Sequence, residues 1–226
     1  MSSNCYQPNP KFYVAVDCII FGYSNGHLKV LLQQRSFEPH AGEWSLVGGF
    51  VQENEDVAEA AKRVLRELTG IKNIYMTQVG TFGAVHRDSG DRVVSIAYSA
   101  LVDINKIDEQ RNHEHAAYWE DLSHLPLLLF DHREMIEHAY QILRATIGRK
   151  PVGFHLLPQK FTLTQLQQLY EAILDTPLDK RNFRKRINDI PCIERTDEVD
   201  HTTSKRGAAL YKFNEQAYLH YQNFRL

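Results

Sequence analysis

Carboxylates gather around residues 55–67, where they could hold a divalent cation. Glu55, Glu59 and Glu67 lie in or beside a stretch with helical spacing, and Mg²⁺ takes oxygen ligands of this kind. The same acids are explained equally well as negative charge at a helix N-terminus and as an i,i+4 partner for Arg63. The residue types therefore leave two interpretations open, a metal site and a purely structural helix.

A second concentration of charge lies near the C-terminus, where five basic residues fall within positions 180–186. When Phe183 and Ile187 face a core, a turn of about 100° per residue directs the basic side chains to the opposite side. Arg and Asn side chains read base edges, and Lys and Arg bind phosphates. A solvated charged face is the alternative. We predict contact with double-stranded DNA through Lys180, Arg181, Asn182, Arg184, Lys185 and Asn188.

The segments around this basic helix predict a winged helix-turn-helix. A capping box, Thr162-x-x-Gln165, begins a helix with an apolar stripe, and Asp179 can cap the basic helix that follows. Two strands are expected at residues 192–195 and 209–213, and two helices followed by such a ribbon are typical of this DNA-binding motif.

The loop between the two strands would form the wing. Lys205 and Arg206 beside Gly207 suit a wing tip that enters a minor groove or lies on phosphate. Three acids would lie in the same loop and would be repelled by DNA, so they are expected to point away: Asp197, Glu198 and Asp200.

Strands and helices alternate in the first two thirds of the chain. A hairpin around Ser24-Asn25-Gly26 and a helix closed by Gly70 are the clearest local signals. Strands are expected at residues 12–21, 28–32, 75–82 and 92–102, and helices at about 56–69 and 131–147. The helix-breaking residues Gly148, Pro151 and Gly153 follow the second helix. The predicted organisation is therefore a domain at 1–147, a linker at 148–158 and a DNA-binding domain at 159–226.

Composition excludes several classes of protein. With 226 residues, 43% of them hydrophobic, the chain can build a packed core and is not a disordered protein. The net charge of -2 divides into 15 basic and 19 acidic residues over 1–150, and 11 and 9 over 151–226. Cys5, Cys18 and Cys192 form no disulfide spacing, and no apolar run has the roughly 18 residues of a membrane span. We therefore expect a cytoplasmic protein that does not enter a membrane.

The segment from Gly49 to Ile71 resembles the Nudix box, G-x5-E-x7-R-E-U-x-E-E-x-G-U, in which U is a bulky aliphatic residue. Residues 42–46 and 119–132 match the family as well, so the resemblance covers roughly residues 8–147. It implies an α/β fold, an α/β/α sandwich with a mixed sheet. It also implies Mg²⁺-dependent hydrolysis of a nucleoside diphosphate linked to another group.

Departures from the box change the expected function. Positions 64, 67 and 68, where the family has glutamates that converge on metal and water, carry Val64, Glu67 and Leu68 here. Aliphatic groups offer Mg²⁺ no oxygen, and Val64 and Leu68 lie within an apolar helical stripe. We expect no catalytic residue, metal or cofactor, and a Nudix fold that is retained as a ligand pocket.

The effector-binding residues are predicted from segments that flank the ligand cleft in Nudix relatives, together with Glu67 at the edge of the box helix. They offer a cation, stacking rings and polar groups: Arg35, Trp44, Phe50, Glu67, His86, Arg87 and Asp88. Structural roles are the alternative. Arg87 and Asp88 could be turn residues, and Trp44 could belong to the core.

A Nudix domain, a short linker and a winged helix with FTLTQLQQLYEAILDTPLDKRNFRKRI at the junction resemble the NrtR family of Nudix-related regulators, including sugar-responsive relatives such as the arabinose regulator AraR. The resemblance implies a small-molecule effector, ADP-ribose or a pentose sugar, that changes affinity for a DNA operator. A homodimer is expected because paired winged helices read two half-sites. The alternatives are a working Nudix hydrolase with an accessory nucleic-acid-binding domain and a winged helix that binds protein.

Overall fold

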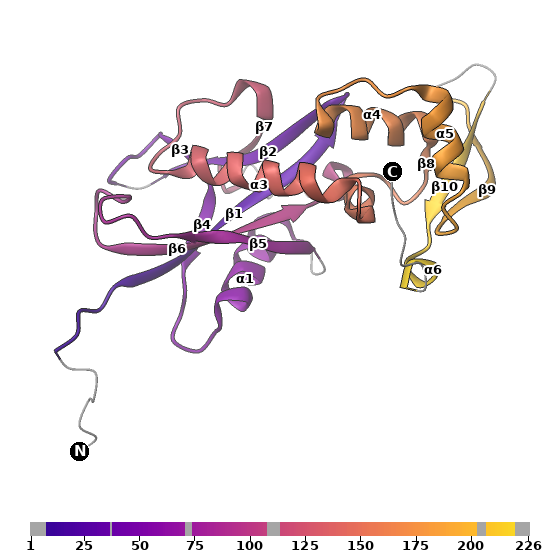
Figure 1. Cartoon of the computed structure of the whole chain (residues 1–226). Coiled ribbons are helices and arrows are strands. Elements are labelled where there is room, and N and C mark those ends of the chain that lie inside the picture. The colour runs from indigo at the N-terminus through magenta and orange to yellow at the C-terminus, as the bar shows by residue number, and fades with distance from the viewer. Residues whose placement is uncertain (1–7, 37, 71–73, 108–113, 203–206, 220–226) are drawn as a thin grey trace.

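A mixed sheet flanked by helices is followed by a smaller sheet with its own helices (Figure 1). The computed structural model describes residues 8–36, 38–70, 74–107, 114–202 and 207–219. The strands of the larger sheet are β1 (Tyr13–Ser24), β2 (His27–Gln34), β3 (Trp44–Ser45), β4 (Val47–Phe50), β5 (Tyr75–Phe82), β6 (Val93–Leu101) and β7 (Ala117–Asp121).

The central strand β1 has different partners along its two halves. One edge runs parallel to β6 over residues 13–21. On the other edge, residues 15–18 pair antiparallel with β4 and residues 20–24 pair antiparallel with β2. The sheet is therefore mixed, as predicted, and β2 and β4 diverge beside the middle of β1.

Helices cover both faces of this sheet, because alternate residues of β1 point to opposite sides (Figure 1). On one face Ile19 and Phe21 join helix α3 (His132–Ile147) in what we call the first core. On the other face Val16, Cys18 and Ile20 join helix α1 (Val57–Thr69) in the second core. The predicted α/β/α sandwich is confirmed.

Local sequence signals set several boundaries. Asp56 caps α1, where its side chain accepts from the Glu59 N–H at 2.8 Å and the Glu59 side chain accepts from the Asp56 N–H at 2.9 Å. Gly70 ends the helix in the left-handed region, with φ 72°. Asn25 and Gly26 make the hairpin turn with φ values of 52° and 83°. The predicted helix and hairpin are confirmed.

The C-terminal part is a winged helix-turn-helix, as predicted. Thr162 and Gln165 form the capping box, and the Asp179 side chain accepts from the Asn182 N–H at 2.8 Å. A short strand before the first helix was not predicted; it pairs with the last strand of the ribbon. The elements are β8 (Phe161–Thr162), α4 (Leu163–Leu174), α5 (Lys180–Asn188), β9 (Ile193–Asp200), β10 (Ala208–Phe213) and α6 (Glu215–Leu219).

The wing differs from its predicted form. Strand β9 extends to Asp200, which pairs with Ala208, so Asp197, Glu198 and Asp200 lie in a strand and not in the loop. Backbone pairing with β10 holds this polar segment extended, and Glu198 forms an ion pair with Lys160. Lys205 and Arg206 lie outside the described residues.

The first core continues from one domain into the other. Three short 3₁₀ helices occur, η1 (Ile104–Lys106), η2 (Leu122–His124) and η3 (Pro151–Leu156). Within the predicted linker, Val152 and Leu156 of η3 are buried in the first core, which contains residues of the larger sheet as well as Leu166 and Tyr170 of α4. The segment 148–158 is therefore packed against both parts of the molecule. Among the described residues, no helix has the length and apolar character needed to cross a bilayer.

Candidate ligand cleft and DNA-binding surface

A cleft of about 240 Å³ lies where β2 and β4 diverge from β1. Its floor comes from β1, its walls from the ends of β2 and β4, and its rim from the loop before β6 and the start of α3. Its lining includes Asp17, Arg35, Gly48, Phe50, Arg87, Asp88 and His132.

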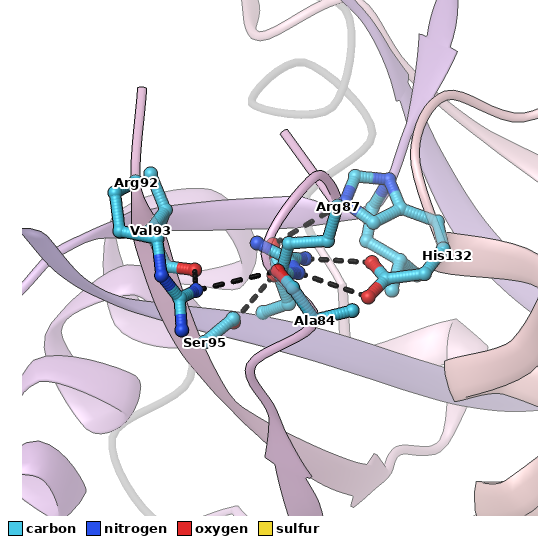
Figure 2. A network of polar contacts seen from close by, with 9 residues as sticks. Ala84, Arg87, Arg92, Val93, Ser95 and His132 are labelled. Carbon is cyan, nitrogen blue, oxygen red and sulfur yellow. Dashed lines mark hydrogen bonds and ion pairs between the residues drawn. The ribbon is translucent and has the colours of Figure 1, made fainter. Parts of the chain in front are cut away.

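A network of buried charges forms the floor of the cleft. The Arg87 guanidinium donates to both carboxylate oxygens of Asp131, from Nε at 2.9 Å and from an Nη at 2.7 Å. The same Nη lies 3.4 Å from Asp17 Oδ2, to which the Ser95 hydroxyl donates at 2.6 Å. Figure 2 shows Arg87, Ser95 and His132 gathered around this network.

Electrostatics keep Arg87 charged although only 3% of its side chain is exposed. Burial is the largest single influence and lowers its pKa, but the hydrogen bond to Asp131 and the charges of Asp17 and Asp131 together raise the pKa above its ordinary value. Paired charges with shared hydrogen bonds are the form in which ions are stable in an interior. The guanidinium is thus occupied by carboxylates within the protein.

His132 is held in one tautomer at the start of α3. The Leu46 backbone N–H donates to its Nδ1 at 3.0 Å, which leaves the proton on Nε2, 3.7 Å from Asp17 Oδ1. Burial, the largest influence, lowers the pKa of His132 below its ordinary value of 6.5. The imidazole is therefore neutral near pH 7 and adds no positive charge to the floor.

The structure divides the predicted effector residues into two groups. Arg35, Phe50, Arg87 and Asp88 line the cleft. Three others are absent from its lining: Trp44, whose ring meets Tyr118 edge-on at 5.7 Å beside the first core, His86, which is exposed, and Glu67.

Asp17, Asp131 and His132 were not predicted as site residues. Asp17 had a visible signal, because it is the only charge between Val14 and Phe21 in a strand buried on both faces. A carboxylate in such a strand needs polar partners, and those partners come from β6, α3 and the loop that carries Arg87.

The residues of the Nudix box do not fit Mg²⁺. Val64 and Leu68 are 5% and 3% exposed in the second core. Glu67 faces solvent with a carboxylate oxygen 3.6 Å from Arg63. Glu55 accepts from Arg63 at 2.6 Å, and this hydrogen bond lowers the Glu55 pKa to about 2. In the described part of the chain, no three His, Cys, Asp or Glu residues are grouped as metal ligands would be.

The DNA-binding surface predicted on α5 has the expected orientation. Phe183 and Ile187 are 5% and 1% exposed, and Phe183 packs against Tyr170 of α4 with ring centroids 6.0 Å apart. The predicted contact residues of this helix are all exposed: Lys180, Arg181, Asn182, Arg184, Lys185 and Asn188. The helix thus combines a buried apolar side with a basic outer side.

Comparisons with known proteins agree with this architecture. Residues 11–139 match the NUDIX domain family, and residues 153–213 match the NrtR DNA-binding winged helix domain. The chain is 36% identical over 213 residues to the ADPR responsive transcriptional repressor NtrR of Acinetobacter baylyi, which covers 92% of this chain and 85% of that protein.

Two solved structures of Shewanella oneidensis NrtR are similar to this chain. The structure complexed with a 27mer DNA has a TM-score of 0.83 at 30% identity, over 94% of this chain and 97% of that one. Its NUDIX domain complexed with ADP ribose has a TM-score of 0.51 at 32% identity, over 62% of this chain and 94% of that one. An ADP-ribose pyrophosphatase of Methanocaldococcus jannaschii is 34% identical over 124 residues, 55% of this chain and 70% of that protein.

A Nudix domain that carries a cleft, joined to a winged helix, defines a ligand-responsive DNA-binding transcriptional regulator. The basic helix and the cleft are the two surfaces that such a protein needs. The chain belongs to the NrtR family, and the predicted resemblance is confirmed.

Proposed function

We propose that this protein is a transcriptional repressor that binds ADP-ribose in the cleft without hydrolysing it. The observation that carries the proposal is the state of the box helix, because Val64 and Leu68 are buried where metal-binding glutamates are expected. The cleft meanwhile keeps groups suited to a nucleotide. A repressor and a pyrophosphatase among the relatives both carry ADP-ribose in their names, which favours this ligand over a pentose.

The cleft offers separate groups for the parts of such a ligand. Arg35 at its wall can neutralise a diphosphate, and the Phe50 ring, 56% exposed, can stack on a base. The enclosed volume of about 240 Å³ is smaller than a typical small-molecule pocket. We infer that one end of the ligand enters the cleft while the base lies at the rim.

Helix α3 provides a physical connection between cleft and DNA-binding domain. It begins at Asp131 and His132 beside the cleft, and its other end contacts α4. There the Tyr140 hydroxyl donates to the Ile173 carbonyl at 3.0 Å and Arg144 donates to the Leu174 carbonyl at 2.9 Å. A ligand that shifts the start of α3 would thereby shift α4 and α5. Effector and operator affinities would then be linked reciprocally.

The assembly and the domain limits complete the proposal. We infer a homodimer, because two winged helices reading two half-sites bind an operator more tightly than one. The ligand-binding domain comprises residues 1–147 and the DNA-binding domain 159–226, with the packed segment 148–158 between them.

The ligand-binding half is tested by calorimetry with the full chain. We expect saturable binding of ADP-ribose, no binding of arabinose or ribose, and no release of AMP when Mg²⁺ or Mn²⁺ is added. Efficient release of AMP would favour the alternative, a working hydrolase. Binding of a pentose but not of ADP-ribose would assign the cleft to a sugar.

The DNA-binding half needs an operator, which the full chain can select from a random pool of duplexes. On that duplex, Arg184→Ala should weaken binding at least about tenfold, and binding should fall steeply with salt. Arg66→Ala is the matched control, since Arg66 is an exposed helical arginine of the other domain. Equal affinities for the two variants would show that α5 is not the recognition helix.

A further inference from the structure

Asp17 is a buried carboxylate that lines the cleft, and among the described residues one of its two oxygens lies within hydrogen-bond distance of no donor. Asp17 Oδ2 receives the Ser95 hydroxyl at 2.6 Å and lies 3.4 Å from Arg87. Among the described residues, none donates to Oδ1 within hydrogen-bond distance, and the protonated Nε2 of the neutral His132 stands 3.7 Å away. Asp17 is 8% exposed and lines the cleft, so the ligand space is the route by which Oδ1 can be reached.

The backbone at Gly48 approaches Oδ1 closely. A Cβ on Gly48 would stand 2.5 Å from Asp17 Oδ1 and 2.7 Å from the Val16 carbonyl oxygen. Both distances are shorter than real carbon–oxygen contacts, so only glycine fits at position 48. The Gly48 backbone and the carboxylate therefore form a close-fitting floor.

The charge of this floor selects the kind of group that can enter. Asp17 and Asp131 contribute two negative charges and Arg87 one positive charge, while His132 is neutral because burial lowers its pKa. The floor is thus left with one net negative charge. A phosphate would be repelled there, whereas a hydroxyl group can donate a short, charge-assisted hydrogen bond to a carboxylate.

We propose that Asp17 Oδ1 accepts a hydrogen bond from a hydroxyl of the ligand's terminal sugar and so determines specificity for a ribosylated nucleotide. The sugar then occupies the acidic floor, and the diphosphate faces Arg35 nearer the mouth of the cleft. This inference rests on the proposed binding of ADP-ribose and adds which end of the ligand lies innermost. A nucleotide without the terminal sugar leaves a desolvated carboxylate oxygen unsatisfied, which is unfavourable.

The substitution Asp17→Asn isolates the role of this oxygen. Ser95 and Arg87 both donate to the Oδ2 position, so the amide oxygen will be held there and the NH₂ group will replace Oδ1. The acceptor at the cleft is then lost while the side chain keeps its size. Asp121→Asn is the matched control, because Asp121 is a strand carboxylate paired with Lys29 away from the cleft.

The experiment measures affinities of ADP-ribose and ADP by calorimetry for the full chain and both variants. Wild type and Asp121→Asn should prefer ADP-ribose by about 10- to 100-fold, the range of a hydrogen bond to a charged group. Asp17→Asn should reduce the preference to about threefold or less, with ADP affinity little changed. A full preference in Asp17→Asn would overturn the inference.

A second probe decides the question in the wild type, even where the variant does not fold. The tetrahydrofurfuryl ester of ADP keeps the diphosphate and the sugar-sized ring but has no hydroxyls on that ring. It should bind no better than ADP; affinity equal to that of ADP-ribose would overturn the inference while leaving nucleotide sensing intact. Failure of ADP-ribose itself to bind would instead overturn the proposed function, and the inference with it.

Discussion

His132 is a buried base whose proton affinity ties stability to pH. Burial lowers its pKa in the folded protein below the ordinary value of 6.5. In the pH range between the lowered pKa and about 6.5, the unfolded chain binds a proton at this residue and the folded protein does not. Stability is therefore complete above that range and is lost as the pH falls through it. His132→Asn keeps an acceptor for the Leu46 N–H and removes the titration.

We predict that urea unfolding from about pH 7.5 to about pH 5.5 costs wild type more stability than His132→Asn, by up to about 1.4 kcal/mol per pH unit. The pKa of His155 is also lowered by desolvation, and this residue contributes equally in both proteins. Parallel pH profiles would mean that His132 is not held neutral.

For single residues, the sequence predicted which side chains lie at the cleft better than it predicted what each side chain binds. Arg35 and Phe50 were predicted beside a ligand and do line the cleft, whereas the Arg87 guanidinium is bound to Asp17 and Asp131. That network joins β1, a loop and the start of α3. No local spacing rule could show that these segments meet.

Helix α1 differs most from its counterpart in an active Nudix hydrolase, because its apolar stripe belongs to the second core. Val64→Glu would restore a box residue but bury a carboxylate among Ala60, Leu65 and Leu68. We predict a loss of about 3 kcal/mol in the free energy of unfolding. Denaturant midpoints with and without Mg²⁺ measure it, and Glu67→Gln, on the exposed side of α1, should stay within about 0.5 kcal/mol. A Val64→Glu variant stabilised by Mg²⁺ would contradict this account of α1.

Helix boundaries were predictable because their signals are local. Asp56, Thr162 and Asp179 cap their helices as their neighbours in sequence indicate. Strands were less predictable where they pair with a segment that is far away in the sequence. The extension of β9 to Asp200 and the presence of β8 both depend on β10, which no periodicity in the polar segment reveals.

For the whole molecule, the shared first core and α3 make cleft and recognition helix parts of one packed body. Arg144→Met removes the hydrogen bond to the Leu174 carbonyl and keeps most of the side-chain volume. We predict that ADP-ribose binds this variant normally but changes its operator affinity several-fold less than in wild type. Anisotropy titrations on a labelled operator measure both quantities. An unchanged response would exclude the α3–α4 contact as the connection.

The most direct test of the regulator itself is operator affinity of the full chain at increasing concentrations of ADP-ribose. We predict that saturating ADP-ribose changes the operator Kd by about tenfold, within the usual range of coupling between two sites, while the nucleotide is recovered intact. An operator Kd that does not respond to ADP-ribose, together with conversion of the nucleotide to AMP, would contradict the account.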